Sequence, residues 1–179
     1  MKLVIIPGLG DSGPEHWQTL WKKKFTGSIR VRQCDWDFPD LQSWIAALQA
    51  VVEAEHSDLV LVSHSLGVAL VAHWAAKHNA THVRGALLVS PSDVDSPAHT
   101  PEVVRGFAPM PLQKLPFKSI VVASSNDTFV STERARFFAN QWKSEFIDLG
   151  PQGHINAASG LGLWEEGQKI LARLIPAYP

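Results

Sequence analysis

The sequence has few of the features that mark secreted, membrane-embedded or nucleic-acid-binding proteins. Its 179 residues include one cysteine, Cys34, so no disulfide can form within the chain. No apolar run approaches the roughly 20 residues needed to span a bilayer. The N-terminus leads into an apolar strand at Leu3 without the charged region and cleavage site of a secretory signal. These absences predict a cytoplasmic protein with no membrane partner.

Charge of either sign is also sparse. The chain carries 16 basic and 17 acidic residues, a net charge of -1, and no run of like charge. Binding to a polynucleotide needs a basic patch, so we expect no nucleic-acid partner. The histidines are scattered and show no spacing typical of zinc ligands, so we expect no metal and no cofactor.

Apolar runs rich in β-branched residues alternate along the chain with stretches of helical spacing. A hydrophobic content of 45% and a charged content of 18% are typical of a globular protein, and the length fits one domain over 1–179. The predicted strands are Leu3–Ile6, Ile29–Gln33, the run from Leu59, Arg84–Ser90, Ser119–Ser124 and Phe146–Leu149. The predicted helices run from about Pro14 to Phe25, from Leu41 to Glu55 behind the cap Asp40, and over Leu66–His78, Thr132–Trp142 and Leu163–Ile175. This alternation predicts an α/β fold, a mostly parallel six-stranded sheet with helices on both faces.

The stretch from Leu59 to Gly67 predicts a strand that turns sharply into a helix at Ser65. Small residues at 63 and 67 let strand and helix pass close together, as in the nucleophile elbow G-x-S-x-G of α/β-hydrolases. Ser63 replaces the first glycine, a change that a small side chain permits. An ordinary strand-to-helix turn is the simpler interpretation of this stretch alone.

Two further residues follow predicted strands. Asp127 follows the strand that ends near Ser124, and His154 follows the strand that ends at Leu149. The carboxyl ends of parallel strands share one edge of a sheet, and the order serine, aspartate, histidine is that of the α/β-hydrolase triad. We therefore predict Ser65 as nucleophile, His154 as its base and Asp127 as the residue that orients the base.

Other residues compete for these roles. Asp93 and Asp95 follow an earlier strand and are the alternatives to Asp127. His64 adjoins the nucleophile but is expected to point away from it. His16 opens the helix at the mouth of the predicted site, so we predict that it contacts substrate.

The turn Gly8–Gly13 has two interpretations. In a hydrolase it supplies an oxyanion donor, the amide of Leu9 or, failing that, of Gly10, to act beside the amide of Leu66. The same turn matches the dinucleotide-binding pattern G-x-G-x-x-G, with Asp35 or Asp37 placed to bind a ribose. That second interpretation leaves Ser65, Asp127 and His154 without a shared role.

Five short motifs together resemble the small serine hydrolases typified by retinoblastoma-binding protein nine. They are Ile6–Gly10, Glu15–Gln18, Ser63–Gly67, Asn126–Asp127 and Gly153–Asn156. The resemblance covers most of the chain and implies a minimal α/β-hydrolase domain with the same three catalytic residues, without the additional N-terminal antiparallel strands of larger relatives. The chain has no L-x-C-x-E segment, so we do not expect a retinoblastoma-protein partner.

These observations predict a carboxylesterase-like serine hydrolase for small acyl esters. Only the irregular segment Pro91–Pro116 is available as a cap, so the pocket should be shallow and partly open. Trp17, Trp36 and Phe107 are expected to line it. The alternatives are a non-catalytic binding module on the same fold, or an amidase, thioesterase or acyltransferase with the same triad. The sequence leaves the oligomeric state open.

Overall fold

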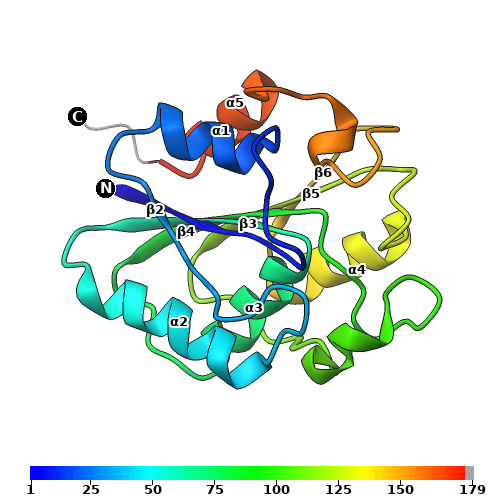
Figure 1. Ribbon diagram of the computed structural model, residues 1–179, viewed down its shortest axis with the longest axis horizontal. Helices are drawn as coiled ribbons and strands as arrows, with labels where there is room; N and C mark the ends of the chain where they lie inside the picture. The colour runs from blue at the N-terminus through cyan, green and yellow to red at the C-terminus, as the bar shows by residue number, and fades with distance from the viewer. Residues whose placement is uncertain (176–179) are drawn as a thin grey trace.

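One six-stranded parallel sheet organises the residues that the computed structural model describes, 1–175 (Figure 1). The strands are β1 (Lys2–Ile6), β2 (Ile29–Arg30), β3 (Leu59–His64), β4 (Val83–Val89), β5 (Lys118–Ala123) and β6 (Glu145–Asp148). Their order is β2-β1-β3-β4-β5-β6, and every neighbouring pair is parallel. The structure thus confirms the predicted six-stranded α/β fold.

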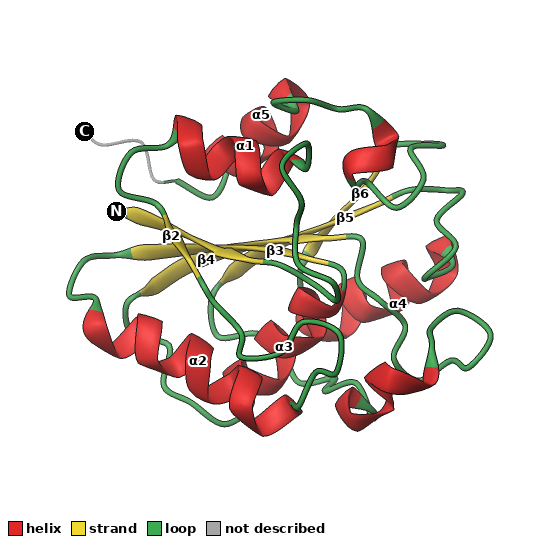
Figure 2. Cartoon of the chain, viewed as in Figure 1, coloured by secondary structure: helices red, strands yellow, loops and turns green. Residues whose placement is uncertain are grey.

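Helices cover both faces of this sheet (Figure 2). The α-helices are α1 (Trp17–Lys24), α2 (Leu41–Ala54), α3 (Leu66–Ala75), α4 (Thr132–Trp142) and α5 (Glu165–Ala172), and the 3₁₀ helices are η1 (Glu102–Phe107) and η2 (Ala157–Ser159). Helices α1 and α5 pack on one face, and α2, α3 and α4 pack on the other. The strands are apolar on both sides because both sides are covered.

Successive side chains of β3 point to opposite faces of the sheet, so this strand contributes to both hydrophobic cores. Leu59 and Leu61 belong to the core beneath α2, α3 and α4, whereas Val60 and Val62 belong to the core beneath α1 and α5. His64 continues the second set and faces the α1 side. This orientation decides what His64 contacts at the end of the strand.

The strand order creates a crevice between β1 and β3. From β1 the chain passes outward to β2, and it then returns to β3 on the other side of β1. Loops leave the two carboxyl ends in opposite directions at such a point, and ligands bind there in open α/β sheets. The turn after β1 and the residue after β3 therefore meet at this crevice.

Helix α1 starts later than the sequence predicts. It begins at Trp17, with His16 as its N-cap, whereas Pro14 was expected in its first turn. Gly10 and Asp11 both have positive φ, 72° and 62°, so the turn after β1 continues in left-handed conformations before any helix starts. The imidazole Nδ1 of His16 then accepts the amide of Gln18 at 3.1 Å and caps the helix.

The irregular segment between β4 and β5 is held by one arginine. Arg105, in η1, donates to the carbonyl oxygens of Val94, Ser96 and Thr100. His73 on α3 contacts the same segment, donating from Nε2 to the carbonyl oxygen of Phe107 at 2.7 Å. This segment is therefore a fixed cap over α3, although it lacks regular periodicity.

In the region described, we find no helix both long enough and apolar enough to traverse a bilayer.

Candidate active site

Ser65 sits on a strained corner between β3 and α3. Its φ of 56° and ψ of −125° lie in a region that residues with a Cβ rarely adopt. Such a conformation costs about 1 to 3 kcal/mol and persists only where the surrounding structure enforces it. Leu66 begins α3 directly after it, so the hydroxyl is presented at the N-terminus of a helix.

Two glycines leave the space that this corner needs. A Cβ at Gly67 would lie 2.5 Å from the carbonyl oxygen of Ile6, and one at Gly8 would lie 2.8 Å from the Cβ of Ser65. Ser63 occupies the remaining small position, fully buried, with its hydroxyl 3.4 Å from the carbonyl oxygen of Leu87. The first glycine of the motif is therefore replaceable here, but the one at 67 is not.

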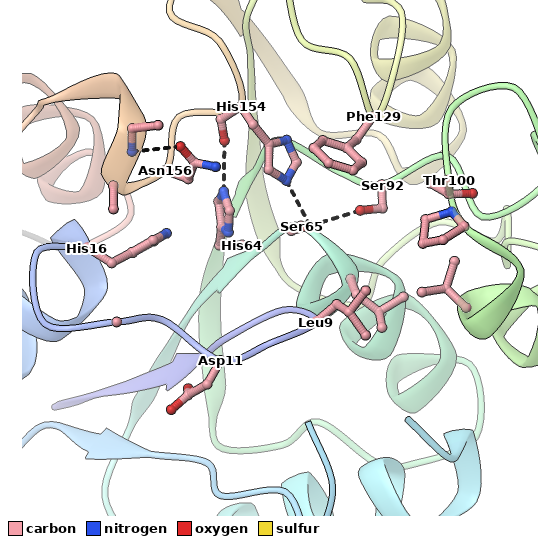
Figure 3. A pocket seen from close by; sticks show the side chains of 16 residues that line it. Leu9, Asp11, His16, His64, Ser65, Ser92, Thr100, Phe129, His154 and Asn156 are labelled. Atoms are coloured by element: carbon pink, nitrogen blue, oxygen red, sulfur yellow. Dashed lines mark hydrogen bonds between the residues drawn. The ribbon is translucent and has the colours of Figure 1, made fainter. Parts of the chain in front are cut away.

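The structure brings Ser65, His154 and Asp127 into one line of hydrogen bonds. The Nε2 of His154 lies 2.8 Å from the Ser65 hydroxyl (Figure 3). Its Nδ1 lies 2.9 Å from each carboxylate oxygen of Asp127. The Asp127 carboxylate is fully buried and also accepts the amide of Phe129 at 2.9 Å. An acceptor facing Nδ1 requires the proton there, which leaves Nε2 free to accept the serine proton.

The alternative carboxylates have another partner. Asp93 forms a two-pronged ion pair with Arg134, with N to O distances of 2.8 and 3.0 Å, and Asp95 lies 3.2 Å from the same guanidinium. Asp95 also accepts the amide of Met110. Neither carboxylate contacts His154, so the pair anchors α4 to the cap.

Leu9, in the turn after β1, and Leu66, at the start of α3, both line the pocket at this crevice. As the first residue of α3, Leu66 has an amide without an intrahelical acceptor. The turn after β1 approaches closely, because a Cβ at Gly8 would lie 3.0 Å from the amide nitrogen of Leu66. The amide of Gly10 donates to the carbonyl oxygen of Trp36 at 2.9 Å, so the alternative donor in this turn is already occupied.

His16 lies in the pocket beside these groups. Its Nδ1 accepts the amide of Gln18, and its buried Nε2 has no hydrogen-bond partner among residues 1–175. Burial, and then the positive charge of Arg30, lowers the pKa of His16 from 6.5 to about 4. The ring is therefore neutral at pH 7, with its proton on Nε2.

His64 lines the pocket, whereas sequence reasoning had given it no role and expected it only to point away from the nucleophile. Its ring lies between those of His16 and His154, with centroid distances of 4.8 and 4.7 Å, and its Nε2 donates to the carbonyl oxygen of His154 at 2.8 Å (Figure 3). Burial lowers the pKa of His64 well below its usual value, and the neighbouring His154 acts in the same direction. Sequence reasoning missed this position because the pocket extends over the α1 side of β3, which His64 faces.

Trp17, Trp36 and Phe107 do not line the pocket, contrary to prediction. Trp17 is 1% exposed and donates from Nε1 to the carbonyl oxygen of Ile155 at 2.8 Å. Phe107 is fully buried, and both it and Trp36 pack edge-to-face on the ring of Trp44. These aromatic residues support the loops and helices around the site from within the core.

The pocket has a volume of about 430 Å³ and opens beside Ser65. In Figure 3, Leu9 and Thr100 lie on one side of Ser65, and His16 and Asn156 lie on the other. The lining residues that sequence reasoning missed are Asp11, Gly13, Ser92, Thr100, Pro101, Val104, Phe129, Asn156, Ala157 and Ala158. Ser92 has a hydroxyl 2.9 Å from that of Ser65, and the only signal for it was its position shortly after β4.

The glycine-rich turn does not form a dinucleotide site. In such a site the helix opens at the glycines, whereas α1 begins at Trp17 and the turn packs against the elbow. Asp35 accepts the amides of Asp37 and Phe38 within its own loop. The described residues also contain no group of three or more histidine, cysteine, aspartate or glutamate side chains that could hold a metal ion.

Comparison with solved structures identifies the fold as that of α/β-hydrolases. A YdeN-like hydrolase from Pectobacterium atrosepticum is 34% identical, with a TM-score of 0.85 over 98% of this chain and 92% of that one. The ydeN gene product of B. subtilis is 19% identical, with a TM-score of 0.77 over 97% of each chain. Est1E from Butyrivibrio proteoclasticus is 16% identical, with a TM-score of 0.74 over 97% of this chain and 88% of that one.

The family is more specific than the fold. Residues 3–173 match the family described as serine hydrolase, and the chain belongs to that family. A search of curated proteins finds no match.

Proposed function

We propose that this serine hydrolase is a carboxylesterase that cleaves small acyl esters through Ser65, His154 and Asp127. The observation that carries the proposal is the unbroken line of hydrogen bonds from the Ser65 hydroxyl through both nitrogens of His154 to the buried carboxylate of Asp127. Each group has the neighbour that its role requires, because a serine hydroxyl is a poor nucleophile without an adjacent base.

The acylation step follows from this geometry. The hydroxyl oxygen of Ser65 attacks the ester carbonyl while Nε2 of His154 takes its proton, and the resulting imidazolium is stabilised by Asp127. The same Nε2–H then donates its proton to the departing alcohol oxygen, leaving an acyl-serine. Water, activated by His154 in turn, attacks the acyl carbon and releases the acid and the free serine.

The tetrahedral intermediates carry a negative oxygen that needs two donors. We assign these to the amides of Leu66 and Leu9. Leu66 lies at the positive end of the α3 dipole, and the Leu9 turn is held against the elbow by the close approach at Gly8. Gly10 is not assigned, because its amide is already hydrogen-bonded to Trp36.

The pocket favours a small substrate. A volume of about 430 Å³ is at the lower end of the range for small-molecule sites. Leu9, Pro101 and Val104 offer the acyl group an apolar wall, whereas His16 and Asn156 are polar. We assign His16 to a contact with the bound ester, because its side chain forms part of the pocket wall.

An activity-based fluorophosphonate probe tests this proposal. We expect covalent labelling of the wild type at Ser65, no labelling of Ser65→Ala, and retained labelling of Ser92→Ala, a matched change at the neighbouring hydroxyl. A folded wild type that is not labelled would contradict the proposal and favour a non-catalytic binding module.

A substrate panel tests the bond and the acyl length. Esters, thioesters and amides of two to twelve carbon atoms should be compared by kcat/KM, with and without an added alcohol or amine acceptor. We expect short-chain esters to be the best substrates and water to be the acceptor. A preference for amides or thioesters, or efficient transfer to the added acceptor, would assign the same three residues to a different reaction.

We also propose a cytoplasmic location and a place among the small serine hydrolases of the retinoblastoma-binding protein nine type. The lone cysteine, which allows no disulfide within the chain, supports the first, and the five shared motifs support the second. The expected partner is a small-molecule ester. Fractionation of cells that express a tagged chain would test the location.

A further inference from the structure

The loop that carries His154 is held in an unusual backbone conformation. The residues on either side of His154 both have positive φ, 61° at Gly153 and 47° at Ile155. Glycine adopts such values readily, but a β-branched residue does so only when other contacts enforce them. Ile155 is also fully buried, so the strained turn is locked into the core beneath α1.

Residues that follow β5 hold two backbone amides at the start of this loop. The hydroxyl of Ser124 accepts the amide of Gln152 at 2.8 Å, and the side-chain oxygen of Asn126 accepts the amide of Gly153 at 2.7 Å. These contacts precede His154 in the chain. They fix the start of the loop, but the direction of the backbone after His154 depends on other contacts.

Two buried side chains hold the backbone carbonyl groups of the loop at His154 and Ile155. His64 at the end of β3 donates from Nε2 to the carbonyl oxygen of His154, and Trp17 in α1 donates from Nε1 to the carbonyl oxygen of Ile155, both at 2.8 Å. His64 and Trp17 are 5% and 1% exposed. Figure 3 shows the His64 ring directed at the backbone of His154, on the side away from Ser92. Two successive carbonyls thus each receive a donor from a distant part of the chain.

We propose that His64 and Trp17 are positioning residues, a pair of donors that clamps the His154 loop so that Nε2 stays aimed at Ser65. This inference rests on the proposed function, since it concerns the same three groups. Asp127 fixes one end of the imidazole, but the ring can still swing about that contact if the backbone behind it moves. The clamp removes this freedom.

The protonation state of His64 fits the clamp. A carbonyl oxygen only accepts, so the proton must lie on Nε2. Burial keeps the ring neutral by lowering its pKa, and the groups facing it are His16, Trp17 and His154. A neutral ring at this place does not oppose the positive charge that His154 acquires during the reaction.

Substitutions at His64 test the clamp with a matched control. His64→Gln places an amide nitrogen about where Nε2 lies and keeps the donor. The shorter side chain of His64→Asn cannot bring its amide nitrogen within reach of the His154 carbonyl oxygen, and His64→Leu has no donor. With a short-chain p-nitrophenyl ester, we expect kcat to fall by about 10 to 100-fold in the Asn and Leu variants, since small misplacements of catalytic groups cost that much. KM should stay within about twofold, and the Gln variant should retain most of the wild-type kcat.

A second readout follows His154 itself. The proton between Nδ1 of His154 and Asp127 should give a low-field proton NMR signal in the wild type and in His64→Gln. The signal should be broadened or lost in His64→Leu and in Trp17→Phe, which keeps an aromatic ring but removes the N–H donor together with part of the indole. Circular dichroism on every variant separates loop movement from unfolding.

The outcomes separate the two proposals. Equal kcat in wild type and His64→Leu would overturn the clamp, as would a Gln variant as impaired as the Leu variant, because packing alone would then explain the effect. If the wild type reacts with no fluorophosphonate or ester, the proposed function fails. The NMR signal then decides the clamp by itself, and its persistence in His64→Leu and Trp17→Phe would overturn the clamp.

Discussion

At the scale of single residues, two buried aspartates near the pocket have different partners. Asp127 is buried against His154, and Asp93 is buried against Arg134. Both follow a strand at the same edge of the sheet, so the sequence favoured Asp127 but kept Asp93 as an alternative. The basic partner makes the distinction, because an aspartate already paired with arginine is not available to orient an imidazole.

The first prediction separates these two aspartates. Asp127→Asn presents an amide that favours the wrong histidine tautomer, so we expect kcat to fall by roughly 10⁴-fold with little change in stability. Asp93→Asn should keep most of the activity and lose about 1 to 2 kcal/mol of stability, because Arg134 loses the more buried of its two carboxylate partners. Ester hydrolysis and urea unfolding measure the two effects. The reverse pattern would make Asp93 the orienting residue.

The second prediction concerns His16. Its pKa is about 4 in the folded chain against 6.5 in the unfolded chain, so the unfolded chain binds more protons between these pH values. The free energy of unfolding should therefore fall as the pH is lowered from 6.5 towards 4. His16→Asn keeps an N-cap acceptor and removes the titration, so its unfolding free energy should lose about 1 to 3 kcal/mol less over this range. Urea titrations at pH 7 and 4.5 check this, and equal losses in both proteins would contradict it.

The positions of site residues could be predicted where the chain direction alone places the side chain. Ser65, Asp127 and His154 each follow a strand, and parallel strands bring such positions to one edge. Trp17 and His64 were misjudged because their partners are backbone carbonyls of a loop about 90 or more residues away. Helical spacing and strand alternation give the face of an element, but they do not give the atom that will lie opposite.

At the scale of elements, α3 packs closely against the end of β1. Gly67, in the first turn of α3, faces the carbonyl oxygens of Ile6 and Pro7, and a Cβ there would lie 2.5 and 2.7 Å from them. Both atoms belong to the backbone and cannot move independently of β1. The distance between these elements therefore sets the geometry of the elbow and of the turn after β1 together.

The third prediction tests this contact. Gly67→Ala should force α3 away from β1, which costs at least about 1 to 3 kcal/mol and slows fluorophosphonate labelling of Ser65. Gly106→Ala is the control, since a Cβ there meets nothing within 4 Å. Thermal unfolding and labelling rates check both variants. Equal behaviour of the two alanine variants would show that the elbow tolerates a wider gap.

Element boundaries were less predictable than element types. The apolar runs indicated all six strands, but β2 has only two paired residues and α5 begins at Glu165 behind Trp164, whose φ is 42°. The 3₁₀ turn η2 was not predicted, because it depends on a local capping box between Asn156 and Ser159. Such ends are decided by turns of a few residues, which carry little periodic signal.

At the scale of the whole molecule, a well-packed sheet supports a strained site. The two cores on either side of the sheet are almost wholly apolar, whereas Ser65 and Ile155 at its edge have positive φ. Strain at these two residues offsets part of the stability that the cores supply. Relieving the strain should therefore stabilise the protein while abolishing the proposed reaction.

The fourth prediction measures that strain at Ser65. Ser65→Gly and Ser65→Ala both remove the hydroxyl, so both should be inactive. Glycine accepts the positive φ without strain, so Ser65→Gly should be more stable than Ser65→Ala by about 1 kcal/mol. Urea midpoints of the two variants give the difference. An alanine variant as stable as the glycine variant would show that the corner is unstrained.

The pocket takes its walls from Leu9 to Ala158, nearly the full span of the described chain. A nascent polypeptide on the ribosome has the serine long before it has the histidine, and until β6 joins the sheet the Ser65 hydroxyl has no base beside it. If the proposed function holds, a chain that lacks His154 should not cleave esters. In an in vitro translation reaction, ester hydrolysis should then begin only after the chain has been both synthesised and folded.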